Sequence, residues 1–305
     1  MKNKVLTGLL LVLIGGWGNL LAQNAGSNYA RQVNTLIGTK GVGLTSGYLY
    51  PGATYPYGMV QFTPSYFSKR SGFVINQLSG GGCEHMGNFP TFPVKGKLKM
   101  SPDNILNYRI NISEEKGHAG YYEAMVQEDI KAKLTVTERT GMASYEYPAD
   151  QQYGTVIIGG GISATPIEQA AIVITAPNKC EGYAEGGNFC GLRTPYKVYF
   201  VAEFDADALE SGTWKRDELK PNTTFAEGEY SGVYFTFDVS KKKNVQYKIG
   251  VSYVSVENAR ENLKAENAEW DFQKIQNQAE AKWNHYLGMI EVEGTNPDRT
   301  TKFYT

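Results

Sequence analysis

Between about residue 28 and residue 256, short apolar segments with alternating polar positions are separated by turn residues. These segments are rich in β-branched and aromatic residues and are too short for helices, which favours β-strands. The predicted strands lie at residues 131–138, 142–148, 154–160, 170–177, 196–204, 232–239 and 245–256. Many strands without intervening helices predict a mainly β protein, built on a large antiparallel β-sandwich over residues 23–256.

The apolar period changes after residue 256. From there to Tyr286, apolar residues recur at steps of three and four, which is typical of a helix. The apolar stripe consists of Leu263, Phe272, Ile275, Ala279, Trp283 and Tyr286. We expect a helical linker over residues 257–290, broken between Asn267 and Asp271, with this stripe buried against the sandwich or a further domain.

The last residues change character again. Residues 289–294, MIEVEG, are predicted to form a short strand. Thr295 or Asn296 then suits the N-cap of a helix, with Pro297 in its first turn. This helix reaches Thr305 after about two turns, and isolated helices of that length are marginal in water. We therefore expect residues 291–305 to be the truncated start of a C-terminal domain.

The N-terminus has the pattern of a secretory signal peptide. Lys2 and Lys4 precede an apolar run over residues 5–17, and Ala22 suits a cleavage site. The alternative is an N-terminal membrane anchor, but the run is short for a spanning helix. We expect residues 1–22 to be removed and the mature chain to be exported, periplasmic or extracellular, with no membrane partner.

Charge and composition narrow the function classes. The chain has 30 Lys and Arg against 31 Asp and Glu, so its formal net charge is -1. That balance argues against nucleic acid as a partner, because phosphate binding needs clustered basic residues. The excess lies instead in 34 Gly, 21 Tyr and 13 Phe, a composition found in β-sandwiches and in proteins that bind sugars.

An exported chain can form disulfides. Cys180 and Cys190 are ten residues apart, across a Gly-containing stretch able to turn back on itself. We therefore predict a Cys180–Cys190 disulfide, with Cys83 as an unpaired, packed thiol. No C-x-x-C pair is present and the three His are scattered, so no metal site is predicted in this chain.

A Gly-rich segment at residues 78–88 is the first candidate site. It lacks the lysine of a phosphate-binding loop, so its glycines indicate either close approach to a ligand or simply a tight turn. The candidate substrate-binding residues are Gly81, Gly82, Cys83, Glu84 and His85. Glu84 is the most suggestive carboxylate, although a solvated loop carboxylate explains it better.

The second candidate site is the stretch around residues 185–196. Asn188 suits hydrogen bonding to sugar hydroxyls, Phe189 suits stacking on a pyranose ring, and Arg193 suits the orientation of a polar group. The alternative is a hairpin loop with nothing bound.

Several stretches together resemble a known family. They lie at residues 33–65, 78–88, 117–148, 190–204 and 256–294, and the most distinctive motifs are YPGATYPYGMVQ and IEVEG. These segments resemble the N-terminal region of glycoside hydrolase family 92, the exo-acting α-mannosidases of bacteria. The resemblance covers nearly the whole mature chain.

The resemblance implies an N-terminal β-sandwich joined through helical linkers to a C-terminal (α/α) barrel. It further implies a calcium-dependent enzyme that cleaves terminal α-mannosides of glycans with inversion, in a pocket between the two domains. The family places its catalytic carboxylates in the C-terminal domain, where the calcium ligands are also expected, so no catalytic residue is predicted in this chain. This chain would contribute one wall of the pocket, with the barrel in cis or as a separate chain.

Two positions depart from the family pattern. The Gly-rich segment usually carries His and Asp where this chain has Gln77 and Asn88. These changes indicate either altered specificity or a degenerate copy. The alternative function is a stand-alone, non-catalytic sandwich that binds carbohydrate or a protein partner.

Overall fold

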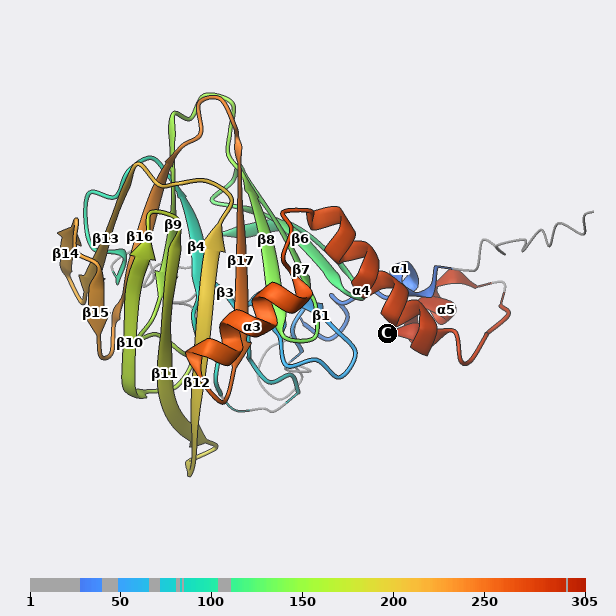
Figure 1. The fold of residues 1–305 in the computed structure, drawn as a ribbon. Helices are drawn as coiled ribbons and strands as arrows, with labels where there is room; N and C mark the ends of the chain where they lie inside the picture. Colours follow the sequence, from blue (N-terminus) through green and yellow to red (C-terminus); the bar gives the residue numbers. More distant parts are fainter. Residues whose placement is uncertain are drawn as a thin grey trace, which may run out of the picture.

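Two antiparallel β-sheets packed face to face form the body of the molecule (Figure 1). The computed structural model describes residues 28–39, 49–65, 72–80, 83, 85–103, 111–294 and 296–305. The predicted signal peptide lies outside these residues. The predicted fold class, mainly β with a few C-terminal helices, is confirmed.

Within the described residues, one sheet has eight strands and the other has nine. The eight-stranded sheet consists, in spatial order, of β1 (Ala53–Thr54), β2 (Gln61–Pro64), β3 (Phe73–Val74), β4 (Thr91–Lys95), β9 (Tyr153–Gly159), β16 (Ser231–Asp238), β13 (Glu210–Lys215) and β14 (Glu218–Pro221). The nine-stranded sheet consists of β15 (Phe225–Glu227), β10 (Ile167–Ala176), β11 (Lys179–Phe189), β12 (Leu192–Phe204), β17 (Asn244–Ser252), β8 (Thr140–Glu146), β7 (Ile130–Val136), β6 (Tyr121–Val126) and β5 (Ile112–His118).

The core lies between the two sheets and follows from the alternating pattern. Along β6, buried and partly exposed residues alternate without interruption, as expected for a strand with one face on the core. Large aromatic side chains from both sheets meet there, and the ring of Phe204 lies 4.9 Å from that of Phe235 and 5.3 Å from that of Tyr247. Each such fully buried side chain stabilises the fold by roughly 1.5–3 kcal/mol.

The strand predictions agree with the structure in seven places, at β7, β8, β9, β10, β12, β16 and β17. The predicted strand at residues 289–294 is wrong, because these residues form a turn and an irregular segment. A strand needs a partner for its backbone groups, and no described strand lies beside this segment. Its residues Met289 and Ile290 are exposed instead.

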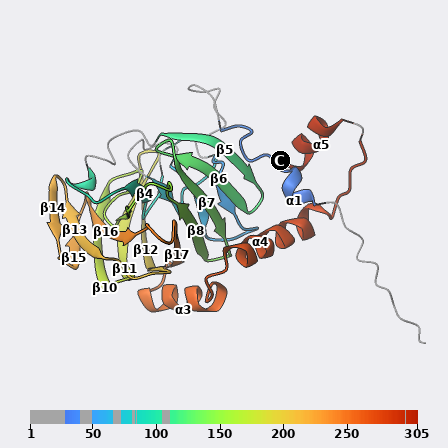
Figure 2. The same cartoon turned by 90° about the horizontal axis from the view of Figure 1, so that it is seen from above.

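Helix α3 (Val256–Glu266) begins where β17 ends and packs on the outer face of the nine-stranded sheet (Figure 2). Ser255 caps it by accepting a hydrogen bond from the Asn258 N–H at 3.1 Å. Leu263 and Ala259 pack on Val201 of β12. The approach is close, because a Cβ at Gly250 would lie 2.4 Å from the Ala259 carbonyl oxygen.

A buried lysine fixes the break between the two linker helices. Lys248, on β17, is 3% exposed, and its Nζ donates to the carbonyl oxygens of Asn267 at 3.0 Å and Ala268 at 3.1 Å. The same Nζ lies 4.3 Å from the ring centre of Trp270. These contacts end α3 and set the direction of the next helix, at the break that the sequence predicted.

Helix α4 (Phe272–Leu287) crosses the end of the sheet formed by β6, β7 and β8. A Cβ at Gly120, in the β5–β6 turn, would lie 2.8 Å from the Cβ of Ala279, so only glycine permits this contact. Trp283 Nε1 donates to the Thr54 carbonyl at 2.7 Å and joins α4 to β1. The helix is therefore held at both halves of its length.

Two further helices extend away from the sandwich, the first packed on α4 and the second packed on the first (Figure 2). They are α1 (Tyr29–Gln32) and α5 (Pro297–Tyr304), and the rings of Tyr29 and Tyr304 lie 5.0 Å apart. Asn296 caps α5, as one of the two residues predicted for that role. None of the described helices combines the length and apolar character needed to cross a membrane.

The predicted apolar stripe of the linker is buried only in part. Leu263 and Ile275 are 3% and 4% exposed, so they belong to the core. Phe272, Trp283 and Tyr286 keep partial exposure, and Tyr286 contacts the highly exposed ring of Tyr57. The N-terminal half of the linker is therefore covered by the sandwich, whereas its C-terminal half borders solvent here.

Candidate functional site

A disulfide brings the two candidate sites together. Cys83 of the Gly-rich segment is bonded to Cys190 at the tip of the β11–β12 hairpin, across 107 residues of sequence, with Cα atoms 5.5 Å apart. The predicted Cys180–Cys190 pairing is wrong, as is the unpaired state predicted for Cys83. Gly81, Gly82 and Glu84 lie outside the described residues.

The reason for the error is the straightness of β11. Cys180 pairs with Ala202 at one end of this strand, and Cys190 follows the other end. An extended strand rises about 3.3 Å per residue, so ten residues separate the two positions by about 33 Å. Cys180 is instead a fully buried free thiol, and burial raises its pKa above the ordinary value.

The polar side chains of the hairpin tip form hydrogen bonds within the protein. The side-chain oxygen of Asn188 accepts a hydrogen bond from the Gly191 N–H at 3.1 Å. Arg193 donates to both carboxylate oxygens of Glu168, at 3.3 and 3.0 Å. Two of the three residues predicted here to bind sugar, Asn188 and Arg193, thus have structural partners, although both remain exposed.

His85 connects the Gly-rich segment to the hairpin. Its ring lies 4.6 Å from the ring of Phe189 and 6.3 Å, edge-on, from that of Tyr196. The histidine is 9% exposed, and burial lowers its pKa, with the backbone of Asn188 opposing the shift. His85 is therefore a neutral, packed ring at neutral pH, and the ring of Phe189 packs against it at a tilt of 44°.

A buried polar network lies beneath these aromatic residues. Asn76 Nδ2 donates to Asn88 Oδ1 at 3.0 Å, and the Asn88 N–H donates to Asn76 Oδ1 at 2.7 Å. Tyr196 donates to the same Asn88 Oδ1 at 2.9 Å, while Tyr253 lies 3.5 Å from Asn76 Nδ2. Among the described residues, nothing accepts a hydrogen bond from Asn88 Nδ2, although Asn88 is fully buried.

Both positions that depart from the family pattern are therefore buried. Gln77 and Asn88 are fully covered, and a Cβ at Gly87 would lie 3.8 Å from Gln77 Cδ. No sequence motif singled out Asn76, Tyr196 and Tyr253 as members of this network. The inward position of Tyr196 in the alternation along β12 was the available signal.

The backbone at the end of the Gly-rich segment is unusual. Met86 and Phe89 adopt the left-handed conformation with φ of 53° each, and Gly87 between them has φ of 76°. Left-handed non-glycine residues are costly and are found at sites where the surroundings fix them. The Met86 carbonyl is held by the Ala164 N–H at 2.8 Å.

A cavity of about 220 Å³ borders the other end of the Gly-rich segment. It lies among β1, α4, α5 and the residues that follow α1. Trp283, Tyr50 and Tyr304 supply aromatic rings, and Thr35 and Ser79 supply hydroxyl groups. Aromatic rings with a few polar groups suit a small ligand such as a sugar ring.

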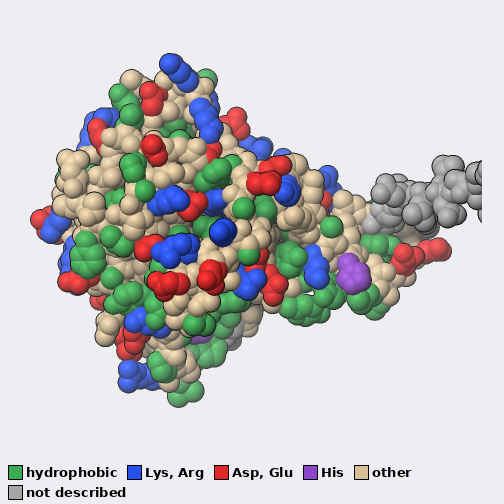
Figure 3. Space-filling view, viewed as in Figure 1, with side chains coloured by type: hydrophobic (Ala, Val, Ile, Leu, Met, Phe, Trp, Pro, Cys, Tyr) green, Lys and Arg blue, Asp and Glu red, His purple; other side chains and the backbone are tan. Residues whose placement is uncertain are grey.

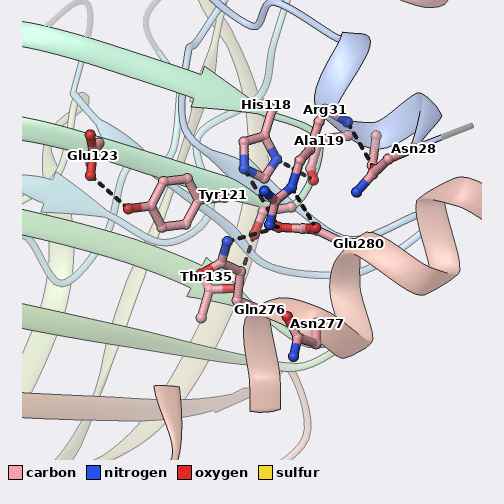
Figure 4. A network of polar contacts seen from close by, with 12 residues as sticks. Asn28, Arg31, His118, Ala119, Tyr121, Glu123, Thr135, Gln276, Asn277 and Glu280 are labelled. Atoms are coloured by element: carbon pink, nitrogen blue, oxygen red, sulfur yellow. Dashed lines mark hydrogen bonds and ion pairs between the residues drawn. The ribbon is translucent and has the colours of Figure 1, made fainter. Parts of the chain in front are cut away.

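The buried carboxylate of Glu280 joins α1, β5 and α4 (Figure 4). It accepts hydrogen bonds from Arg31 Nε at 3.1 Å and Gln276 Nε2 at 2.7 Å, and His118 Nε2 lies 3.6 Å away. Burial opposes its ionisation, but the hydrogen bonds from Arg31 and Gln276 outweigh it and lower its pKa. Glu280 is therefore an ionised structural group, unlike a general acid, whose pKa must be raised.

The described surface carries mixed charge. Basic and acidic side chains are interspersed over the face that carries α3 (Figure 3). Among the described residues, no group of three or more His, Cys, Asp or Glu side chains is arranged to hold a metal ion.

Comparison with protein-family models gives two matches. The N-terminal domain of glycosyl hydrolase family 92 matches residues 32–252, and the catalytic domain of the same family matches residues 258–305. A curated relative is an uncharacterized secreted glycosidase of Arthroderma benhamiae, 26% identical over 302 residues, covering 86% of this chain and 38% of the relative.

Solved structures give the same likeness. A family 92 α-mannosidase from Bacteroides thetaiotaomicron has a TM-score of 0.78 and 24% identity, over 91% of this chain and 40% of that structure. A family 92 inverting mannosidase from the same organism has a TM-score of 0.76 and 26% identity, over 90% and 38%. The chain thus spans about two fifths of the length of these proteins.

Proposed function

Because the chain belongs to glycoside hydrolase family 92, we propose that it is the sandwich part of an exported, calcium-dependent, inverting exo-α-mannosidase. The reaction class is supported by the structural relative that is an inverting mannosidase, at 26% identity. Export is supported by the curated relative, which is a secreted glycosidase. The substrates we propose are terminal α-mannosides of glycans.

The role of this chain in the proposed enzyme is to supply one wall of the sugar pocket. The observation that carries this role is the Cys83–Cys190 disulfide, because it places the Gly-rich segment against the β11–β12 hairpin. The cavity beside Ser79, with Trp283 and Tyr50 in its lining, extends the same region toward α4. Both features lie next to segments that resemble the family.

The acid and base of the reaction belong, in this proposal, to the C-terminal catalytic domain. Inversion requires two carboxyl groups about 6.5–9.5 Å apart, one with a raised pKa. The most deeply buried carboxylate discussed above, Glu280, has a lowered pKa and a structural role. The calcium ligands are proposed to lie in the same domain, as the family resemblance implies.

The proposal is tested by assaying the purified chain with calcium and an aryl α-mannoside. We expect no turnover by the chain alone, and turnover when a separately expressed family 92 catalytic domain is added. Activity of the chain alone that disappears on mutation of Glu84 would contradict the division of roles. Specific glycan binding without activity in any combination would instead support a non-catalytic sandwich.

A further inference from the structure

The tip of the β11–β12 hairpin extends beyond the strands that flank it. β10 pairs with β11 as far as Gly186, and β17 pairs with β12 from Tyr199 onward. Among the described strands, residues 188–193 therefore pair only with each other. A two-stranded ribbon is marginally stable in water without further packing. The tip must therefore be held by contacts outside its own ladder.

The tip is held to β10 by the Arg193–Glu168 ion pair and to the Gly-rich segment by two further contacts. One is the covalent bond from Cys190 to Cys83, and the other is the packing of the Phe189 ring against the ring of His85. Cys83 and His85 are two residues apart, and Phe189 and Cys190 are adjacent. The disulfide and the ring contact therefore support the same junction.

The junction continues into the buried network. Tyr196 lies edge-on to His85, and its hydroxyl donates to Asn88, which also accepts from Asn76. A displacement of His85 would therefore change the packing of Tyr196 above this network. The contacts are therefore continuous from the disulfide, through His85 and Tyr196, to the buried network around Asn88.

The disulfide is accessible to reagents in solvent. Cys190 is exposed and Cys83 is half-buried, whereas the free thiol of Cys180 is fully buried in the core. A reductant can therefore reach this bond in the folded protein. Export favours the oxidised form, because disulfides persist in oxidising compartments.

We propose that the Cys83–Cys190 disulfide is a positioning element of the sugar pocket, which holds the hairpin tip and His85 in their binding geometry. This role rests on the proposed function and adds a redox dependence to it. When the bond is reduced, the tip separates from the Gly-rich segment and the affinity for the mannoside falls. The two sheets stay folded, because their ladders and core do not involve this bond.

The chemistry of the opening is ordinary thiol–disulfide exchange. A dithiol such as dithiothreitol attacks one sulfur and then closes to its own cyclic disulfide. The S–S bond of the protein accepts two electrons and two protons and becomes two thiols. Reoxidation reverses the change, so the same sample can be measured in both states.

The first test is an NMR titration of the histidines, of which the chain has three. In Cys190→Ser, or after reduction, we expect the pKa of His85 to rise toward the ordinary value of about 6.5, because its ring loses cover. His118 is the internal control, since its pKa is also lowered by burial but it lies on β5. A general loosening of the fold would change the pKa of both histidines.

The second test separates binding from chemistry in the enzyme that includes the catalytic domain. We expect KM for an aryl α-mannoside to rise about tenfold in Cys190→Ser, which is about 1.4 kcal/mol, with kcat little changed. Cys180→Ala is the matched control, because it removes a cysteine and keeps the disulfide. Reduced wild-type enzyme should behave like Cys190→Ser and recover on reoxidation.

Unchanged His85 titration in both Cys190→Ser and the reduced wild type would overturn the positioning role. A changed titration with unchanged KM would overturn the link to sugar binding. If wild-type enzyme with its catalytic domain cleaves no mannoside, the proposed function fails, whereas the titration still decides whether the disulfide holds His85. The two proposals therefore fail separately.

Discussion

The guanidinium of Arg31 donates two hydrogen bonds to the carboxylate of Glu280, at 3.1 and 3.4 Å, across 249 residues of sequence. The carboxylate is almost fully buried, while the Arg31 side chain is more than half exposed. Gln276 donates to the same carboxylate from one turn earlier in α4. This contact attaches α1 to α4.

The first prediction concerns that carboxylate. Glu280→Gln should lower the free energy of unfolding by about 1–2 kcal/mol, because hydrogen bonds to a charged group are lost in a buried place. This loss lies at the low end of the range for hydrogen bonds to charged groups, because solvent screens the charge of Arg31. Chemical denaturation measures the free energy of unfolding. The control is Glu269→Gln, which breaks an exposed ion pair with Lys274 and should change little. Equal effects of the two variants would contradict the assigned role.

The same cluster predicts a dependence of stability on pH. Burial lowers the pKa of His118 below 6.5, although Ala119 and Glu280 oppose this. Its contribution to stability is therefore present above pH 6.5 and is lost as the pH falls below 6.5, because the unfolded chain takes up the proton first. Glu280 also has a lowered pKa, so its contribution is present above pH 4.5 and is lost as the pH falls through its folded value. Arg31 and Glu123 are the other charged groups acting on His118.

Unfolding free energies at pH 8, 6, 5, 4 and 3 check the sign of both effects. Wild type should lose stability in two steps on acidification, first through His118 and the likewise buried His85, and then through Glu280. His118→Gln should reduce the first step and Glu280→Gln the second. A profile that rises toward acid pH would show that the signs are wrong.

The sequence predicted the elements whose signals are local. The alternating segment at residues 170–177 became part of β10, and the steps of three and four from Phe272 became α4. Asn296 followed by Pro297 marked the start of α5. In each case a short stretch of residues carries its own period or cap, so no long-range information was needed.

The features that were missed depend on distant partners. Pairing of Cys83 with Cys190 follows from the position of a loop against a hairpin tip, and residue spacing favoured the wrong cysteine. Asn76 and Tyr196 meet at Asn88 only after the two sheets pack. The segment at residues 289–294 has a strand-like composition but no described strand beside it, so it stays irregular.

The third prediction is the disulfide connectivity itself. Denatured, non-reduced protein should show one free thiol, which belongs to Cys180. A thiol count cannot distinguish this pairing from a Cys180–Cys190 bond, so the measurement is peptide mapping without reduction. We expect a linked peptide pair containing Cys83 and Cys190. A linked pair containing Cys180 would contradict the structure.

The last prediction concerns the family's usual aspartate at position 88. Asn88 Oδ1 accepts from Asn76 and Tyr196, whereas Nδ2 has no acceptor among the described residues. In Asn88→Asp, one carboxylate oxygen would keep both donors and the other would be buried without one. Burial disfavours the charged form, so the pKa of the introduced carboxyl should be raised.

A raised pKa in the folded state fixes the sign of the pH effect. The stability of Asn88→Asp relative to wild type should be greatest at low pH and should fall as the pH rises through the folded pKa. Asn88→Ala is the control, since it leaves Asn76 and Tyr196 without their acceptor at every pH, at a cost of about 1–3 kcal/mol. Unfolding free energies at pH 5 and pH 8 separate the two variants. If the difference between Asn88→Asp and wild type were the same at both pH values, solvent or an unseen donor would have to reach position 88, and the buried network would not be closed.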